Sequence, residues 1–233
     1  MYSKPQKLAA EFLGTFALIF FGAGSICANQ FLRSGSNGQS ELGLLGIALA
    51  HGLTIGIMVT ALGHISGGHF NPAITIGFWV TRRLSTIEFL LYWAAQLTGA
   101  IAAAYLLKRL PVEVWGPVQL GTPGLAGGIS RWNGMLFEGI MTFFLVLVVF
   151  ATAVDERGAF DKVAGFAIGL TITVGALFGG PFTGAALNPA RALGPALALN
   201  HWNNHGVYWV GPLAGGVAAG WLYDTIFLGK NHG

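Results

Sequence analysis

The sequence predicts an all-α membrane protein with six transmembrane helices and two shorter, re-entrant half-helices. Composition is the first reason: 54% of the 233 residues are hydrophobic and only 9% are charged. A soluble domain carries roughly a quarter charged residues, so this chain could not cover a surface in water. The same composition excludes a disordered protein. The net charge of +3 comes without a basic cluster, so we expect no nucleic-acid partner.

The second reason is the length of the apolar segments. Stretches of about 18–22 residues recur six times, which is the length that an α-helix needs to cross a bilayer. They cover approximately residues 8–27, 42–63, 87–107, 134–154, 163–180 and 207–227. Because these stretches are continuously apolar and do not alternate, they favour helices over a transmembrane barrel.

Two further apolar segments have only about half of this length. They begin at the triplets Asn71-Pro72-Ala73 and Asn188-Pro189-Ala190. Asn is a good helix N-cap and Pro is tolerated at the first helical position, so each triplet predicts a helix start. A helix that starts inside a membrane requires protein or a watery cavity around it. The segments are therefore predicted to be re-entrant half-helices.

The two halves of the chain repeat each other. The triplets are 117 positions apart, and the segment from Glu11 (Glu-Phe-Leu-Gly-Thr-Phe) is similar to the segment from Glu138 (Glu-Gly-Ile-Met-Thr-Phe), 127 positions later. Three spans per half is an odd number, so the second half must be inverted relative to the first. We predict one channel domain over 1–233, with a first repeat over 1–110, a connecting outer loop over 111–130 and an inverted second repeat over 131–233.

In this arrangement the half-helices meet N-terminus to N-terminus at the midplane. Each helix start carries roughly half a positive charge, and the two Asn side chains supply amide donors. Water that gives its lone pairs to both amides turns its hydrogens away, which interrupts a proton wire. Cations meet the same positive barrier, whereas a neutral solute does not.

The distribution of Lys and Arg predicts that the N-terminus lies on the inner side of the membrane. The inner loops and ends then hold seven basic residues and the outer side holds four. The inner set is Lys4, Lys7, Arg82, Arg83, Arg157, Lys162 and Lys230, and the outer set is Arg33, Lys108, Arg109 and Arg131. We expect a multi-pass protein of the plasma (inner) membrane with cytoplasmic N- and C-termini.

The segments 63–73 (Gly-His-Ile-Ser-Gly-Gly-His-Phe-Asn-Pro-Ala) and 184–191 (Gly-Ala-Ala-Leu-Asn-Pro-Ala-Arg) resemble the two signature loops of the aquaporin, or major intrinsic protein, family. The resemblance covers essentially the whole chain. It implies an aquaporin-like bundle of six helices and two half-helices, assembled as a homotetramer with one pore per subunit. Exclusion of protons by half-helix dipoles and an Arg is the established account for aquaporins.

The resemblance also implies a selectivity filter at four positions, which fall on His51, Ala176, Ala185 and Arg191. An Arg inside a membrane is costly, so Arg191 is a functional candidate in its own right. This chain departs from the strict water channels of the family, which carry Phe at the His51 position and His at the Ala176 position and have a tight ring. With two Ala residues, Ala176 and Ala185, the resemblance implies a wider ring here. A His at position 51 is similar to the plant tonoplast intrinsic branch.

The same resemblance assigns roles to the loops and to two buried acids. Pore carbonyls are implied at Gly67, Gly68, His69 and Phe70 and at Gly184, Ala185, Ala186 and Leu187. Glu11 and Glu138 must find donors, and we expect each to brace one re-entrant loop through its amides. The alternative is a proton-relay pair, as in a secondary transporter.

Aromatic residues and glycines give two architectural expectations. Tyr and Trp residues near the span ends are typical of interfacial belts or of packing between subunits. These residues are Tyr92, Trp93, Trp132, Trp202 and Trp209. Glycines four residues apart allow helices to pack closely in lipid. The pairs are Gly52/Gly56, Gly165/Gly169, Gly211/Gly215 and Gly216/Gly220.

Together these features predict a passive channel for water, with ammonia and hydrogen peroxide as further candidate solutes, that excludes protons and ions. A glycerol or broad neutral-solute facilitator is one alternative, which the wide ring favours and the water-type flanks at Ala192, Ala196, Tyr208 and Trp209 oppose. An alternating-access secondary transporter is the other. We expect no enzyme, because no nucleophile–base pair shares a face, and no metal or cofactor, because no carboxylate accompanies His64 and His69.

Overall fold

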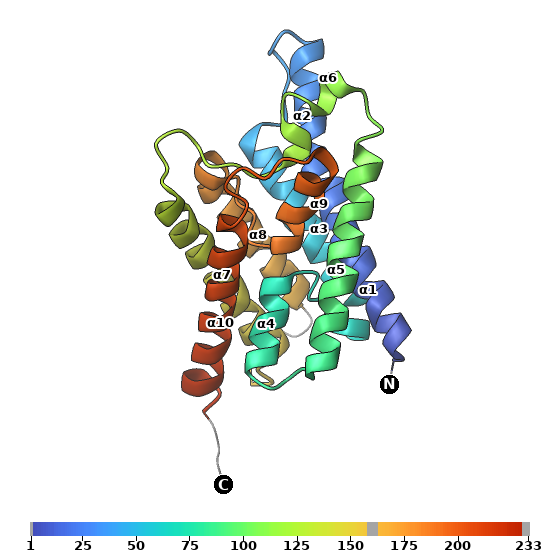
Figure 1. Ribbon diagram of the computed structural model, residues 1–233. Helices are drawn as coiled ribbons and strands as arrows, with labels where there is room; N and C mark the ends of the chain where they lie inside the picture. Colours follow the sequence, from blue (N-terminus) through green and yellow to red (C-terminus); the bar gives the residue numbers. More distant parts are fainter. Residues whose placement is uncertain (1, 158–162, 230–233) are drawn as a thin grey trace.

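The computed structural model describes residues 2–157 and 163–229, which form a bundle of helices (Figure 1). The first and the last described helix ends lie on the same side of this bundle. Lys162 and Lys230, two basic residues used to predict the orientation, lie outside the described residues. Five of the described helices are long and apolar enough to cross a membrane. They are Lys4–Gly35, α3 (Gly43–Ser66), α5 (Thr86–Leu107), α7 (Arg131–Ala153) and α8 (Ala164–Thr183). The sixth span is α10 (Val207–Leu222), continued by the π-helical turn η4 (Tyr223–Phe227).

The first helix is longer than its apolar stretch. It consists of α1 (Lys4–Ala17), the π-helical segment η1 (Leu18–Ala23) and α2 (Gly24–Gly35), whereas the apolar pattern predicts an end near Cys27. The extra turns carry polar residues that bond locally: the Gln30 side-chain amide donates to the Ser34 hydroxyl at 3.0 Å. The Asn29 side-chain oxygen accepts hydrogen bonds from the backbone N–H groups of Leu42 and Gly43, where α3 begins, at 2.8 and 3.0 Å. The helix therefore continues past the apolar stretch because its polar residues find partners there.

The two half-helices are α4 (Pro72–Val80) and α9 (Pro189–Leu199). Each begins inside the bundle, and they run toward opposite ends of it (Figure 1). As the triplets predict, Asn71 and Asn188 are the N-caps, and the following Pro occupies the first turn. The half-helices fill the space that is enclosed by the six spans. A short helix, α6 (Val112–Trp115), and a 3-10 turn, η2 (Gln119–Gly121), lie in the outer connection between α5 and α7.

Helix α3 packs along α8, and α10 packs along both α7 and α4. Glycines line these contacts: a Cβ on Gly56 would come within 3.1 Å of the Gly165 carbonyl oxygen, and a Cβ on Gly77 within 3.1 Å of the Gly216 carbonyl oxygen. Side chains at these positions would push the backbones apart. The predicted close packing through spaced glycines is therefore confirmed.

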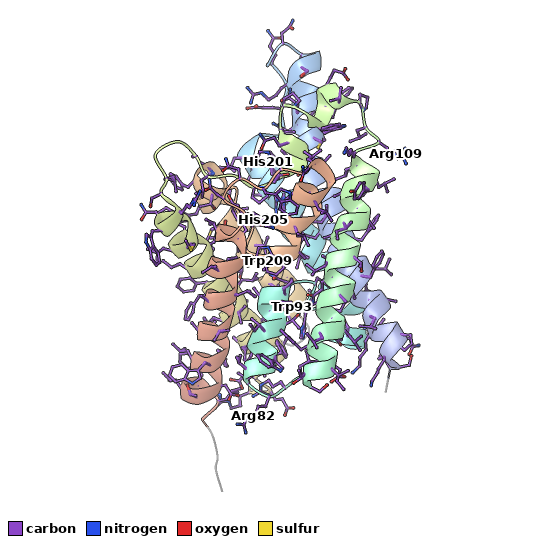
Figure 2. The ribbon with its side chains drawn as sticks, in the orientation of Figure 1. Arg82, Trp93, Arg109, His201, His205 and Trp209 are labelled. Carbon is purple, nitrogen blue, oxygen red and sulfur yellow. The ribbon has the colours of Figure 1, made fainter. Side chains whose placement is uncertain are left out.

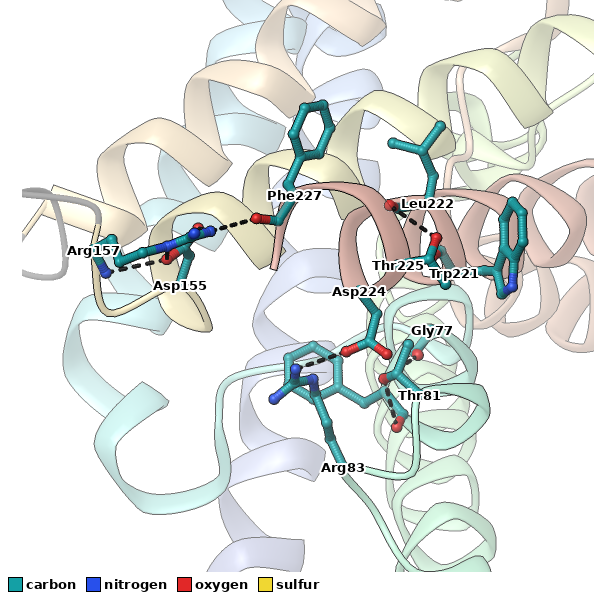
Figure 3. Close-up of polar contacts among 11 residues, drawn as sticks. Gly77, Thr81, Arg83, Asp155, Arg157, Trp221, Leu222, Asp224, Thr225 and Phe227 are labelled. Carbon is teal, nitrogen blue, oxygen red and sulfur yellow. Dashed lines mark hydrogen bonds and ion pairs between the residues drawn. The ribbon is translucent and has the colours of Figure 1, made fainter. Parts of the chain in front are cut away.

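Polar contacts tie two loops at the end of the bundle where the N-terminus lies to the η4 turn (Figure 3). Arg83, which follows α4, bonds Asp224 at 2.8 Å. Arg157, which follows α7, bonds the Asp155 carboxylate at 2.7 Å and the Phe227 carbonyl oxygen at 2.6 Å. The hydrogen bonds from the Arg157 guanidinium hold the pKa of the Asp155 carboxyl below its ordinary value. The η4 turn thus fixes the loop that follows α4 and the loop that follows α7.

Candidate functional site

The two Asn-Pro-Ala loops meet at the middle of the bundle and bond each other. The Asn71 side-chain amide donates to the Leu187 carbonyl at 2.9 Å, and the Asn188 amide donates to the Phe70 carbonyl, also at 2.9 Å. Each Asn side-chain oxygen accepts from its own half-helix, Asn71 from the N–H of Ala73 at 2.8 Å. An amide nitrogen carries two hydrogens. One N–H of each Asn therefore stays available to a solute beside the loops.

Glu11 of α1 holds the first loop. It is fully buried and accepts four hydrogen bonds. The donors are the Ser66 hydroxyl at 2.6 Å, the backbone N–H groups of His69 at 3.0 Å and Phe70 at 2.7 Å, and the Gln96 amide at 2.8 Å. A carboxylate suits this position because it only accepts hydrogen bonds.

Glu138 of α7 holds the second loop in the same way. It is also fully buried and accepts from the Thr183 hydroxyl at 2.6 Å and from the backbone N–H groups of Ala186 at 3.0 Å and Leu187 at 2.7 Å. Phe70, Ala185 and Leu187 have φ values of 50°, 43° and 52°, which side-chain-bearing residues rarely adopt. Such conformations persist only where surrounding bonds over-determine them. The two carboxylates supply those bonds at Phe70 and Leu187, and the Thr183 hydroxyl accepts the N–H of Ala185 at 3.1 Å.

A tyrosine supports each loop from behind. The Tyr92 hydroxyl donates to the Ser66 carbonyl, and the Tyr208 hydroxyl donates to the Thr183 carbonyl, both at 2.8 Å. Tyr92 is only 2% exposed, so the expectation that it belongs to an interfacial belt is wrong. Its hydroxyl finds a buried carbonyl, which an aromatic residue at a span end does not reveal from sequence. The sequence analysis missed the supporting role of Ser66, Thr183 and both tyrosines.

One cavity of about 180 Å³ runs past the meeting point of the loops. Both triplet Asn residues and all four predicted filter residues line it. These are Asn71, Asn188, His51, Ala176, Ala185 and Arg191. Six of the eight predicted carbonyl positions also line it, namely His69, Phe70, Gly184, Ala185, Ala186 and Leu187. The structure therefore brings most of the predicted site residues to a single space.

The other predicted residues lie around this cavity. Gly67, Gly68 and the Pro and Ala residues of both triplets are not among the described residues that line it, and neither are Glu11 and Glu138. Gly67 is exposed, and Gly68 has φ of 65°, so both serve the turn that leads from α3 into the loop. The Phe70 and Leu187 carbonyls also accept the cross-loop amides described above, a bond that the sequence did not predict.

His51 and Arg191 give the cavity its polar groups near one end. The His51 Nδ1 lies 2.9 Å from the Ile47 carbonyl, so Nδ1 carries the hydrogen and, in the neutral ring, Nε2 is an acceptor. Arg191 is 2% exposed, and one Nη donates to the Gly121 carbonyl of the outer connection at 2.7 Å. Neither His51 Nε2 nor Arg191 Nε has a partner among the described residues. An acceptor and a fixed cationic donor thus line the same cavity.

The remaining wall of the cavity is aliphatic. It is formed by Leu18, Ile26, Leu44, Ile47, Ile55, Ile74, Leu145 and Ile172, with Gly180 beside them, none of which the sequence analysis identified as a pore residue. Such a wall offers a solute no hydrogen bonds, so the polar contacts come from the Asn residues, the carbonyls, His51 and Arg191. A narrow path with few polar contacts favours small uncharged solutes.

The fold and this site define a class: a multi-pass integral membrane protein with inverted, half-helix-containing repeats around one internal pore. The major intrinsic protein model matches residues 2–223. The chain is 44% identical over 226 residues to Aquaporin TIP4-4 of Zea mays, covering 97% of this chain and 88% of that protein. It is 45% identical to the probable aquaporin TIP3-2 of Arabidopsis thaliana, covering 94% and 82%. The chain belongs to the major intrinsic protein, or aquaporin, family.

A solved structure is also similar. The X-ray structure of the aquaglyceroporin from Plasmodium falciparum matches with a TM-score of 0.82, 25% identity and 97% of both chains covered. Family membership means that the protein is a channel and not an enzyme. The predicted six spans and two half-helices are confirmed by this comparison and by the described helices.

Proposed function

We propose that the cavity is a passive water pore and that the Asn-Pro-Ala loops are its midplane. One observation carries this proposal: the same cavity is lined by both triplet Asn residues and by His51, Ala176, Ala185 and Arg191. A water molecule there meets an N–H from each Asn, loop carbonyls that accept its hydrogens, and otherwise aliphatic walls. Water can pass such a path by exchanging a few bonds at a time.

The same groups exclude protons and cations. The helix starts at Pro72 and Pro189 point their positive ends at the meeting point of the loops. A water oxygen that accepts from both Asn amides cannot also pass a proton along the pore. Arg191 adds a permanent positive charge in a space from which bulk water is largely excluded, which raises the barrier for cations.

The filter determines the further solutes. The acceptor at His51 Nε2 and the donor at Arg191 Nε fit molecules that both donate and accept, such as ammonia and hydrogen peroxide. Two alanines complete the ring, which leaves more room than two large side chains would. A glycerol facilitator stays the second candidate on this ground. The relatives named aquaporins, at 44% and 45% identity, support water over glycerol.

The buried acids support a channel over a secondary transporter. Neither Glu11 nor Glu138 is among the described residues that line the cavity, and each accepts two backbone N–H groups of one loop. A proton relay requires ionisable groups along the solute path. Bracing of the loops is therefore the role that we assign to both acids.

The wider organisation follows from the same contacts. Matched bonds to Glu11 and Glu138 support a first repeat over 1–110, an outer connection over 111–130 and an inverted repeat over 131–233. Because the pore lies within one chain, a homotetramer would hold one pore per subunit. The plant relatives carry the tonoplast intrinsic name (TIP), which favours a vacuole-type membrane over the plasma membrane that we expected from the sequence. Cytoplasmic termini stay a prediction.

The test is a stopped-flow measurement on liposomes exposed to a glycerol jump. Fast shrinkage reports water and reswelling reports glycerol. We expect fast shrinkage without faster reswelling than in empty liposomes. Ala176→Phe should slow the shrinkage to the rate of empty liposomes, because residue 176 lines the cavity, whereas Leu177→Phe on the outer face of α8 should not. Fast reswelling would move the assignment to a neutral-solute facilitator, and equal effects of the two variants would contradict the pore assignment.

A further inference from the structure

A polar pocket of about 390 Å³ lies at the outer end of the bundle, where α7 and α10 begin. We call it the outer pocket, and its polar or aromatic lining is formed by Arg131, Trp202, Asn204 and His205. His205 lies at the same end of the molecule as Arg109 and opposite Arg82 (Figure 2). The pocket is separate from the water path, since none of these four residues lines the pore cavity.

An apolar groove of about 590 Å³ continues from the outer pocket along α7 and α10. The two spaces share Met135 and Val210. The floor of the groove is made of small residues, among them Gly139, Ala214 and Ala218. Because α7 crosses the membrane from Arg131 to Ala153, this groove lies at the depth of the lipid acyl chains.

The outer pocket carries one positive charge in a fixed place. Arg131 Nε donates to the Asn204 side-chain oxygen at 2.8 Å, which orients the guanidinium and leaves its other N–H groups for a ligand. Trp209 Nε1 donates to His205 Nε2 at 3.0 Å, so the neutral His205 ring carries its hydrogen on Nδ1 and is a second donor. Among the described residues that line the pocket, no carboxylate balances the Arg131 charge.

The depth of the pocket matches that of lipid headgroups. Trp132, next to Arg131, is 79% exposed, and Trp202 is also exposed. Exposed tryptophans are typical of the membrane–water interface. The pocket and the groove together fit an anionic group joined to an apolar chain, at the depth where α7 enters the bilayer. A phospholipid has these two parts.

We propose that the outer pocket and the groove together bind one anionic glycerophospholipid. The phosphate lies against the Arg131 guanidinium, and one acyl chain lies in the groove over Gly139, Ala214 and Ala218. A net negative headgroup is favoured over a zwitterionic one because the pocket offers donors and a positive charge but no described carboxylate for a choline or ammonium group.

The experiment is native mass spectrometry of the purified full chain, with palmitoyl-oleoyl phosphatidylglycerol or phosphatidylcholine added in equal amounts. We expect more bound phosphatidylglycerol than phosphatidylcholine. Arg131→Gln should lower the bound phosphatidylglycerol about fivefold, the factor that corresponds to roughly 1 kcal/mol per basic residue near a membrane surface. Arg109→Gln removes the same charge from the same end of the molecule, outside the pocket, and should change binding little.

Two further tests distinguish a bound phospholipid from a free phosphate and from a second copy of the chain in the groove. Ala218→Leu fills the groove from an exposed position and should also lower lipid binding, while both variants keep the water permeability of the wild type because neither residue lines the pore. Glycerol 3-phosphate, which has the headgroup without the chains, should not compete. Any one of four results would overturn the proposal. The first two are equal binding of both lipids and equal losses in Arg131→Gln and Arg109→Gln. The other two are full competition by glycerol 3-phosphate and a change of oligomeric state in Ala218→Leu without loss of lipid.

Discussion

Replacing Glu138 by Gln tests whether the carboxylate braces the second loop. The amide has nearly the same shape as the carboxylate, but one of its two ends donates hydrogen bonds instead of accepting them. In one orientation the new N–H₂ group faces the backbone N–H of Leu187, and in the other it faces the backbone N–H of Ala186. The Thr183 hydroxyl can adapt, since it also lies 3.3 Å from the Gly179 carbonyl. One buried backbone donor therefore loses its acceptor in either orientation.

The cost follows from that single lost acceptor. A buried donor without a partner costs about 1–3 kcal/mol, and the remaining bonds lose the strength that an ionised acceptor gives. For a chain of this size, about 1–3 kcal/mol corresponds to a fall in Tm of roughly 2–12 °C. Leu187 also has a φ of 52°, so the loop that loses its brace is the strained one. We expect a lower water permeability along with the lower Tm.

The assay combines thermal unfolding in detergent with stopped-flow shrinkage of liposomes. Thr142→Val is the matched control, because Thr142 is buried one turn further along α7 and donates only to the Glu138 backbone carbonyl, at 2.7 Å. It should keep the permeability. If Glu138→Gln retains both the Tm and the permeability of the wild type, the bracing role is refuted.

Three other changes give sharp outcomes. The wild type should resist mercurials, because Cys27 is 0% exposed, whereas Ala185→Cys should be blocked and restored by a thiol in the permeability assay. Inhibition of the wild type would show that Cys27 is reachable. Gly216→Val should lower the Tm and the permeability, because the new side chain pushes the first half-helix away. Gly35→Ala, with open space around residue 35, should lower neither. Equal Tm values for the two variants would contradict the close packing at Gly216. Asp155→Asn should lower the Tm at pH 7. Because the pKa of the Asp155 carboxyl is depressed in the folded protein, the difference in Tm between wild type and variant should shrink as the pH falls below about 4. A constant difference in Tm across a pH series would refute the Arg157 pairing.

The sequence predicted the parts of the site that break the membrane pattern. Asn71 and Asn188 are polar, cap helices and recur at matched positions, so their convergence followed from the repeat alone. Glu11 and Glu138 stood out because ionisable residues are rare in such spans. The sequence did not predict the Tyr92 and Tyr208 hydroxyl bonds, because a tyrosine near a span end has the same local pattern whether it faces lipid or a loop.

The pore wall was hidden from the sequence for a physical reason. In a soluble protein, the polar face of a helix marks the outside, and the apolar face marks the core. Here both faces are apolar: along α3, Ile47 and Ile55 line the cavity, whereas Leu53 and Ile57 are 48% and 64% exposed on the outer surface. A lipid-facing surface and a water-selective pore wall both require apolar side chains. Hydrophobic periodicity therefore cannot distinguish the lipid-facing side of a helix from its pore-facing side. Among the polar residues of this helix, His51 is the one that lines the cavity. Once His51 is placed there, the pore-facing positions four residues before and after it follow from the helical turn.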